Sequence, residues 1–259
     1  TPVEIATVEG AGNHTTTCLL GCKFSYGSDG SIVDLRNPDK AKLVGNWHRR
    51  AGIRQHVHDV DEFRRGFIVV SAFEGPMHLI DARDPLRPRV VVSAEPPELR
   101  EEAAAAGANV HATRWPRRGR DRFLMGQGGS NLAQARCDNE TRNFWVWDAS
   151  RWRSHGALKL EDEYTPGNEG PEQGSYPAST CSTHWFEAHP TFHNGGDVAL
   201  AYYDMGTRFL QVTTDGKVKE KGWFLPYGGV TSAVYWITDE LVYAIDYTRG
   251  IDVLRLKRR

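Results

Sequence analysis

The stretch FIVVSAFEGPMHLIDARDP (67–85) consists of two β-rich runs joined by a glycine-containing turn and closed by Asp-Pro. Such runs, bounded by turn residues, predict a β-hairpin. The same pattern recurs as KFSYGSDGSIVDLRNP (23–38), VALAYYDMGTRFLQVTTDG (198–216) and LVYAIDYTRGIDVLRLKRR (241–259). A fifth copy begins as RFLMGQGGS (122–130) and resumes as RNFWVWDAS (142–150), with an insertion between its two strands. The chain therefore contains five predicted hairpins with the same pattern.

Each hairpin has further strand-like segments beside it. The segments before the hairpins begin near His14, His58, His111, His184 and Ser232, and those after the first four hairpins span 41–47, 87–94, 156–164 and 217–224. Four strands per unit in five units predict an all-β fold, a five-bladed β-propeller of four-stranded blades in a single domain, 1–259. A two-sheet sandwich of short strands explains the fivefold repetition less well.

The last unit lacks a fourth strand, because its second β-rich run reaches Arg259. The β-rich segment PVEIATVE (2–9) has no partner of its own. We therefore expect residues 2–9 to complete the last blade and close the ring, which would leave no open sheet edge.

The strand endings SIVDLRNP (31–38) and HLIDARDP (78–85) resemble the repeat of the LVIVD-repeat β-propeller family, most clearly within residues 23–94. The third unit, with FWVWDAS, matches this repeat in part, and the last two match it weakly. Proteins of that family are largely exported or surface-associated. The resemblance therefore implies a propeller fold and an extracytoplasmic location, and it implies little about chemistry.

Four histidines stand at or near the start of a predicted innermost strand: His14, His58, His111 and His184. Ser232 takes the equivalent place in the fifth unit. Innermost strands line the channel of a propeller, so we expect these imidazoles to converge at one mouth. Imidazole is the commonest protein ligand for transition metals, so the pattern predicts a mononuclear site for one metal ion, with iron or copper favoured and zinc possible. His56 is a substitute ligand for His58. The alternative is that each histidine bonds the backbone of the preceding blade at the start of its strand and has a structural role.

Loops at the same mouth contain three candidate catalytic residues. Glu74 is a carboxylate that could orient a ligating imidazole from outside the metal's own ligand set. Tyr203 and Tyr247 could donate protons, although their equivalent places in the repeat favour a role in capping the blades.

These residues predict a metal-dependent enzyme acting on a small molecule, of the oxidoreductase or oxygenase type. Two alternatives stay open at this point. One is a zinc lyase or hydrolase on the same ligands, in which the metal activates water. The other is a secreted binding or interaction propeller in which the histidines are structural.

Composition limits the partners and the compartment. The formal net charge is −1, without the excess of Lys and Arg that marks nucleic-acid binders, and no apolar run is long enough to span a bilayer. Four cysteines favour two disulfides, Cys18–Cys22 and Cys137–Cys181, in a secreted or cell-surface protein. We expect a monomer that binds a small-molecule substrate.

Overall fold

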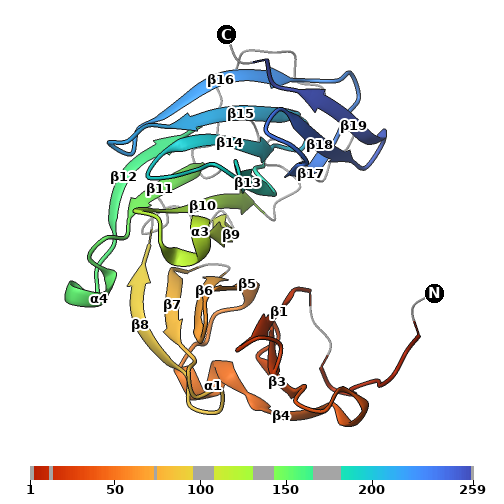
Figure 1. Cartoon of the computed structure of the whole chain (residues 1–259), viewed down its shortest axis with the longest axis vertical. Helices are drawn as coiled ribbons and strands as arrows, with labels where there is room; N and C mark the ends of the chain where they lie inside the picture. The colour runs from red at the N-terminus through yellow and green to blue at the C-terminus, as the bar shows by residue number, and fades with distance from the viewer. Residues whose placement is uncertain are drawn as a thin grey trace.

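Five antiparallel sheets follow one another in chain order along an arc (Figure 1). The computed structural model describes residues 3–11, 14–72, 75–95, 108–130, 143–165 and 182–257. Within each sheet, neighbouring strands are also neighbours in the chain. The five predicted hairpins and the strands beside them are confirmed, because all of them occur as hydrogen-bonded strands of these sheets.

The first four sheets have four strands each. The first sheet contains β1 (Thr16–Leu19), β2 (Phe24–Gly27), β3 (Ser31–Asp34) and β4 (Lys42–Asn46). The second contains β5 (Val57–Arg64), β6 (Phe67–Ala72), β7 (Met77–Asp81) and β8 (Arg89–Ala94). The third contains β9 (Ala108–Arg114), β10 (Phe123–Ser130), β11 (Phe144–Asp148) and β12 (Lys159–Tyr164). The fourth contains β13 (Phe186–Ala188), β14 (Gly196–Ala201), β15 (Thr207–Val212) and β16 (Val218–Phe224).

The fifth sheet has three strands: β17 (Thr231–Trp236), β18 (Leu241–Asp246) and β19 (Gly250–Arg255). The helices in the described part of the chain are single turns in connections: η1 (Pro38–Lys40), α1 (Trp47–Ala51), α3 (Pro116–Gly119) and α4 (Trp152–His155). None of the described helices is long and apolar enough to cross a membrane.

The first strand of each sheet lies on the inner side of the arc, where β1 contacts β5, β5 contacts β9 and β13 contacts β17. We call the space lined by these first strands the channel. The last strands, β4, β8, β12 and β16, lie on the outer side (Figure 1). A residue near the start of a first strand is therefore placed at one mouth of the channel.

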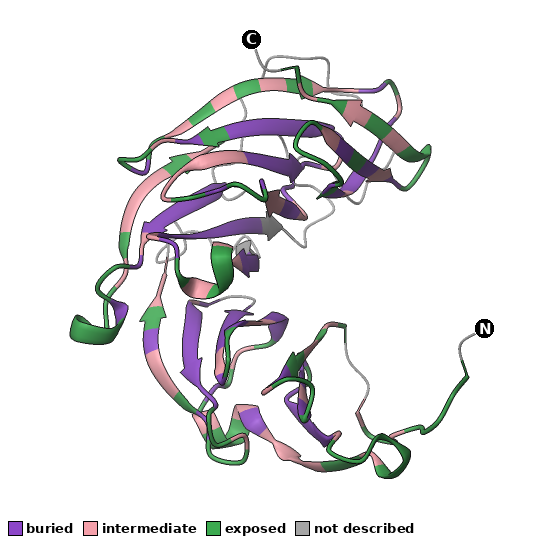
Figure 2. Cartoon of the chain, in the orientation of Figure 1, coloured by how far each residue is buried: buried purple, intermediate pink, exposed green. Residues whose placement is uncertain are grey.

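Four apolar cores lie between successive sheets. Each arises from the alternation of side chains along a strand, which sends successive residues to opposite faces of a sheet. In β11, Trp145 and Trp147 pack toward the second sheet, whereas Phe144 and Val146 pack toward the fourth. The middle strands are therefore apolar on both faces and are largely buried (Figure 2). Burial of these faces supplies the main driving force for stacking the sheets.

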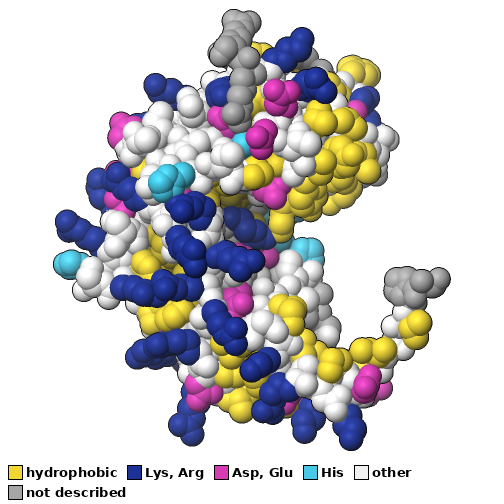
Figure 3. All heavy atoms as spheres, in the orientation of Figure 1, with side chains coloured by type: hydrophobic (Ala, Val, Ile, Leu, Met, Phe, Trp, Pro, Cys, Tyr) yellow, Lys and Arg dark blue, Asp and Glu magenta, His cyan; other side chains and the backbone are white. Residues whose placement is uncertain are grey.

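The fifth sheet is covered on one face only. Val234, Trp236 and Val242 pack against the fourth sheet. On the opposite face, Tyr243 lies directly between Tyr235 and Val253 in the strand register. These three side chains are exposed, Val253 by 62%. Hydrophobic side chains accordingly gather on the surface over this sheet (Figure 3).

The predicted closure of the ring by residues 2–9 is wrong for the described residues 3–9. These residues form no strand, and Val3 and Ile5 are exposed by 79% and 62%. The segment leads away from β1 at one end of the arc, whereas β19 lies at the other end (Figure 1). It therefore pairs with none of the described strands.

The predicted disulfide Cys18–Cys22 is confirmed, with a Cα–Cα distance of 4.5 Å. It joins the two ends of the β1–β2 turn. Cys137 and Cys181 lie outside the described residues. The Cys18–Cys22 bridge agrees with an extracytoplasmic location, and secretion itself stays a prediction.

Removal of residues 1–8 tests the correction of the ring closure. We expect the free energy of unfolding to stay within about 0.5 kcal/mol of the full chain, because residues 3–8 are largely exposed and join no sheet. Urea unfolding of the two proteins would measure this difference. A large loss of stability in the shortened chain would show that the segment completes the fifth sheet in solution.

Candidate functional site

The structure places the four predicted histidines in one row at the channel mouth. The ring centroids of His14 and His58 are 4.5 Å apart, those of His58 and His111 are 3.6 Å apart, and those of His111 and His184 are 4.6 Å apart. The convergence follows from the repeat, since each residue lies within or just before the first strand of its sheet. His58 is buried and His14 is exposed.

The row continues through the two predicted tyrosines. The Tyr203 ring lies 4.8 Å from the His184 ring and 6.2 Å from the Tyr247 ring, measured between centroids. Burial raises the pKa of the Tyr203 phenol above its usual range, which keeps this hydroxyl protonated. Tyr247 is exposed by 65%. Glu74, the third candidate catalytic residue, lies outside the described residues.

Polar side chains near the channel mouth connect each sheet to a neighbour. Thr15 Oγ1 donates to the His58 carbonyl at 2.7 Å, and His58 Nδ1 donates to the His111 carbonyl at 2.8 Å. His184 Nδ1 donates to the carbonyl of Ser232. Thr183 Oγ1 donates to the Gly128 carbonyl and so links the third and fourth sheets. These bonds agree with the structural alternative for the histidines, except that His58 and His184 each bond the following sheet and not the preceding one.

The histidine row does not have the geometry of a metal centre. His58 and His184 each use Nδ1 on a backbone carbonyl, and His111 Nδ1 accepts from Gln127 Nε2 at 2.7 Å. The His58 and His111 rings are in contact and tilted, with 34° between their planes. Within the described part of the chain, no group of three or more His, Cys, Asp or Glu side chains could hold a metal ion. The predicted metal-dependent enzyme, including its oxidoreductase and zinc-hydrolase forms, is therefore wrong.

Burial favours the neutral imidazole in three of these histidines: His58, His111 and His184. It lowers the pKa of His58 to about 4, with a smaller effect in the same direction from His14. Burial also lowers the pKa of His111 well below its ordinary value, and that of His184 by less. A neutral imidazole has one N–H donor, so the contacts of His58 and His184 fix that proton on Nδ1.

A second set of inner-strand residues lies farther along the channel. These residues are three positions after His14, His58, His111, His184 and Ser232, and they are Thr17, Asp61, Arg114, Glu187 and Tyr235. The last four line one cavity of about 240 Å³ together with Trp185. This cavity was not predicted from the sequence, although the constant spacing of three positions from each histidine is a signal that indicates it.

The cavity carries an excess of carboxylates. Arg114 forms an ion pair with Asp59, and its Cζ lies 4.2 Å from the centroid of the Trp185 ring. Asp61 makes no ion pair with any described residue, and Glu187 Oε2 accepts from the Trp236 backbone N–H at 2.6 Å. Burial raises the pKa of both Asp61 and Glu187, against the opposing effect of the Arg114 charge on Asp61. The site can therefore stabilise an added positive charge.

Asp204 is a buried carboxylate beside Tyr203. Neither of its carboxylate oxygens has a hydrogen-bond partner among the described residues. Burial raises its pKa to about 6. An ionised carboxylate in such surroundings lowers stability, because water solvates the charge better than the site does.

The comparisons with known proteins concern the fold. No family model matches the chain, so the LVIVD-repeat resemblance is not confirmed, and no curated protein matches it. A crystal structure of the Myceliophteria thermophila Cps50 (Swd1) β-propeller domain matches with a TM-score of 0.60 and 12% identity, over 92% of this chain and 68% of that chain. A chain in the crystal structure of the mitotic checkpoint complex matches with a TM-score of 0.55 and 13% identity, over 91% of this chain and 59% of that chain. The chain thus has a β-propeller fold.

Replacement of His58 by Asn tests the neutral, structural imidazole. Between pH 6.5 and 4 only the unfolded state gains the His58 proton, so the stability of the natural chain should fall in this range, by up to about 3 kcal/mol from this residue. The amide introduced by H58N keeps an N–H donor without titrating, so this variant should lose less stability. Urea unfolding from pH 7.5 to pH 4 measures both profiles, and parallel profiles would contradict a neutral His58.

Asp204→Asn should change stability with the opposite pH dependence. The folded-state pKa of about 6 exceeds the unfolded value of 3.8, so the stability that Asp204 contributes decreases as pH rises from 4 to 6. The variant should be more stable than the natural chain by about 1–3 kcal/mol at pH 7.5, with a smaller gain at pH 4. Thermal unfolding at both pH values measures the gain. The control is Asp39→Asn, at an exposed carboxylate. An equal gain in stability from this variant would contradict the interpretation that burial of the Asp204 carboxylate lowers stability.

Proposed function

We propose that the protein is an interaction module whose channel cavity receives a cationic side chain, a lysine ammonium or an arginine guanidinium, of a partner protein. The observation that carries this proposal is the composition of the 240 Å³ cavity, where Asp61 and Glu187 come from separate first strands and face the same space. Arg114 is engaged by Asp59, which leaves the other two carboxylates in excess.

Aromatic walls add to the attraction for a cation. The rings of Trp185 and Tyr235 border the cavity, with 6.4 Å between their centroids. A cation within about 6 Å of an aromatic ring face is attracted by the electron density of the ring. Arg114 already makes this contact with Trp185, so the ring is oriented to accept positive charge.

The surroundings of the cavity favour a protein partner over a free small molecule. Tyr235 borders the cavity and also begins the exposed apolar row Tyr235, Tyr243 and Val253 of the fifth sheet. Large exposed apolar patches mark protein contact sites. A partner could thus place one cationic side chain in the cavity and cover the adjoining apolar face. That a similar propeller occurs in the mitotic checkpoint complex agrees with a role in an assembly.

The proposal predicts selective binding of cationic side-chain analogues. Isothermal titration calorimetry would compare two probes with charged side chains, Nα-acetyl-lysine amide and Nα-acetyl-arginine amide, with the uncharged Nα-acetyl-norleucine amide. We expect measurable binding of at least one cationic compound and none of the norleucine compound. Asp61→Asn and Glu187→Gln should each weaken cation binding about tenfold, because each removes one charged partner.

Glu240→Gln is the matched control, since this exposed carboxylate lies in the β17–β18 turn, away from the cavity lining. It should bind the cationic compounds as the natural chain does. Equal binding of the norleucine compound, or no binding of either cationic compound at millimolar concentration, would contradict the proposal. Thermal unfolding of each variant would establish that it is folded.

A further inference from the structure

A groove on the outer side of the second sheet gathers three arginines around one carboxylate. Arg83 and Arg89 both bond Asp81 Oδ2, at 2.7 and 3.0 Å. Arg153, from α4, makes no ion pair with any described residue and lies with its Cζ 4.8 Å from the centroid of the Trp152 ring. Together with Phe67, these residues line a cavity of about 380 Å³. Three guanidinium groups and one carboxylate leave the groove with an excess of two positive charges.

The aromatic floor holds two of the guanidinium groups in place. Arg83 Cζ lies 5.1 Å and Arg153 Cζ lies 5.6 Å from the centroid of the Phe67 ring. These contacts orient the groups without using up their hydrogen-bond donors. The side chains of Arg83 and Arg89 are 62% and 71% exposed, so their donors are accessible from solvent. Lys and Arg side chains gather on the face of the molecule over the second and third sheets (Figure 3).

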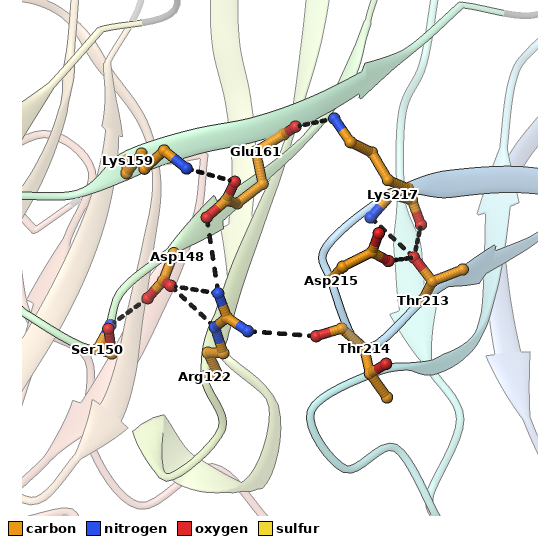
Figure 4. A network of polar contacts seen from close by, with 9 residues as sticks. All are labelled: Arg122, Asp148, Ser150, Lys159, Glu161, Thr213, Thr214, Asp215 and Lys217. Atoms are coloured by element: carbon orange, nitrogen blue, oxygen red, sulfur yellow. Dashed lines mark hydrogen bonds and ion pairs between the residues drawn. The ribbon is translucent and has the colours of Figure 1, made fainter.

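The third sheet contains the equivalent groove with a smaller excess of positive charge, because two carboxylates, Asp148 and Glu161, line it together with three cations: Arg122, Arg151 and Lys159. There Arg122 and Lys159 meet two carboxylates, those of Asp148 and Glu161 (Figure 4). Asp148 pairs with Lys159 in the strand register as Asp81 pairs with Arg89. Glu161 is the extra residue of a bulge in β12, and Val91 is the extra residue of the same bulge in β8. Val91 therefore stands where the third sheet has its second carboxylate.

We propose that this groove, lined by Arg83, Arg89 and Arg153, binds a phosphate dianion, either inorganic phosphate or a phosphate monoester carried by a peptide. The excess of two positive charges matches a dianion, whereas a single carboxylate would neutralise half of it. Arginine is the side chain best suited to phosphate, because its planar fork offers paired N–H donors. The groove of the third sheet has an excess of only one positive charge, because Glu161 supplies a second carboxylate. The site is separate from the channel cavity and has the opposite charge preference.

The test is titration calorimetry with three probes: inorganic phosphate, the amide of N-acetyl-phosphoserine and the amide of N-acetyl-glutamate. We expect at least one phosphate probe to bind, and the glutamate probe to bind about tenfold more weakly or not at all. Binding of inorganic phosphate alone would identify the free anion as the ligand, and preference for the phosphoserine probe would identify a phosphorylated partner.

Two variants test the proposal, one by removing a positive charge from the groove and the other by adding a negative charge. Arg153→Gln removes one guanidinium, and Val91→Glu installs the carboxylate of the third sheet while leaving all three arginines in place. Each should weaken phosphate binding at least about tenfold. Arg36→Gln is the matched control, because Arg36 bonds Asp34 in the same turn of the first sheet. Unchanged binding in both variants, an equal loss in Arg36→Gln, or no phosphate binding by the natural chain would overturn the proposal.

Discussion

A hydrogen bond from an imidazole N–H to the backbone of the next sheet is the interaction on which the channel depends. His58 makes this bond to the third sheet and His184 makes it to the fifth. The hydrophobic attraction between sheets is non-directional, whereas a directional hydrogen bond fixes how one first strand is aligned with the next. The same alignment places the residues three positions after the histidines and Ser232 in one cavity: Asp61, Arg114, Glu187 and Tyr235. Burial keeps the imidazoles of His58 and His111 neutral, so acid lowers the stability of the folded chain, because the unfolded state gains these protons more readily.

The same repeat produces two sites of opposite charge. On the inner side, Asp61 and Glu187 exceed the positive charge that Arg114 supplies to the channel cavity. On the outer side, Val91 leaves the arginines of the second sheet without a second carboxylate. The backbone is equivalent from blade to blade, so single side chains at equivalent positions decide the charge of each site. A nearly neutral chain can therefore present a cation site and an anion site together.

The strands and their grouping into sheets could be predicted from the sequence, because period-two alternation and glycine turns are local signals. The meeting of the four histidines followed from the repeat. The structural role of the histidines could not be predicted, because the orientation of each ring and the hydrogen bond of its Nδ1 depend on the backbone of another sheet. The channel cavity was missed because it joins residues of several strands, and the outer groove because a bulge sets its register. The predicted closure rested on the missing fourth strand of the last unit and on the β-rich pattern of residues 2–9, and neither places a segment at the distant end of an arc.

The protonation state and tautomer of the histidine rings directly test whether His58 and His184 are neutral imidazoles that bond the following sheet. Two-dimensional long-range ¹H–¹⁵N NMR of ¹⁵N-histidine-labelled protein at pH 7 distinguishes Nδ1–H, Nε2–H and doubly protonated rings. We expect neutral Nδ1–H rings for His58 and His184. The variants H58N and His184→Asn assign the two sets of signals. These signals should not change when iron(II), copper(II) or zinc is added. Nε2–H rings, charged rings or shifts on adding one equivalent of metal would contradict these expectations. The imidazoles would then be available as ligands rather than committed to the neighbouring sheet.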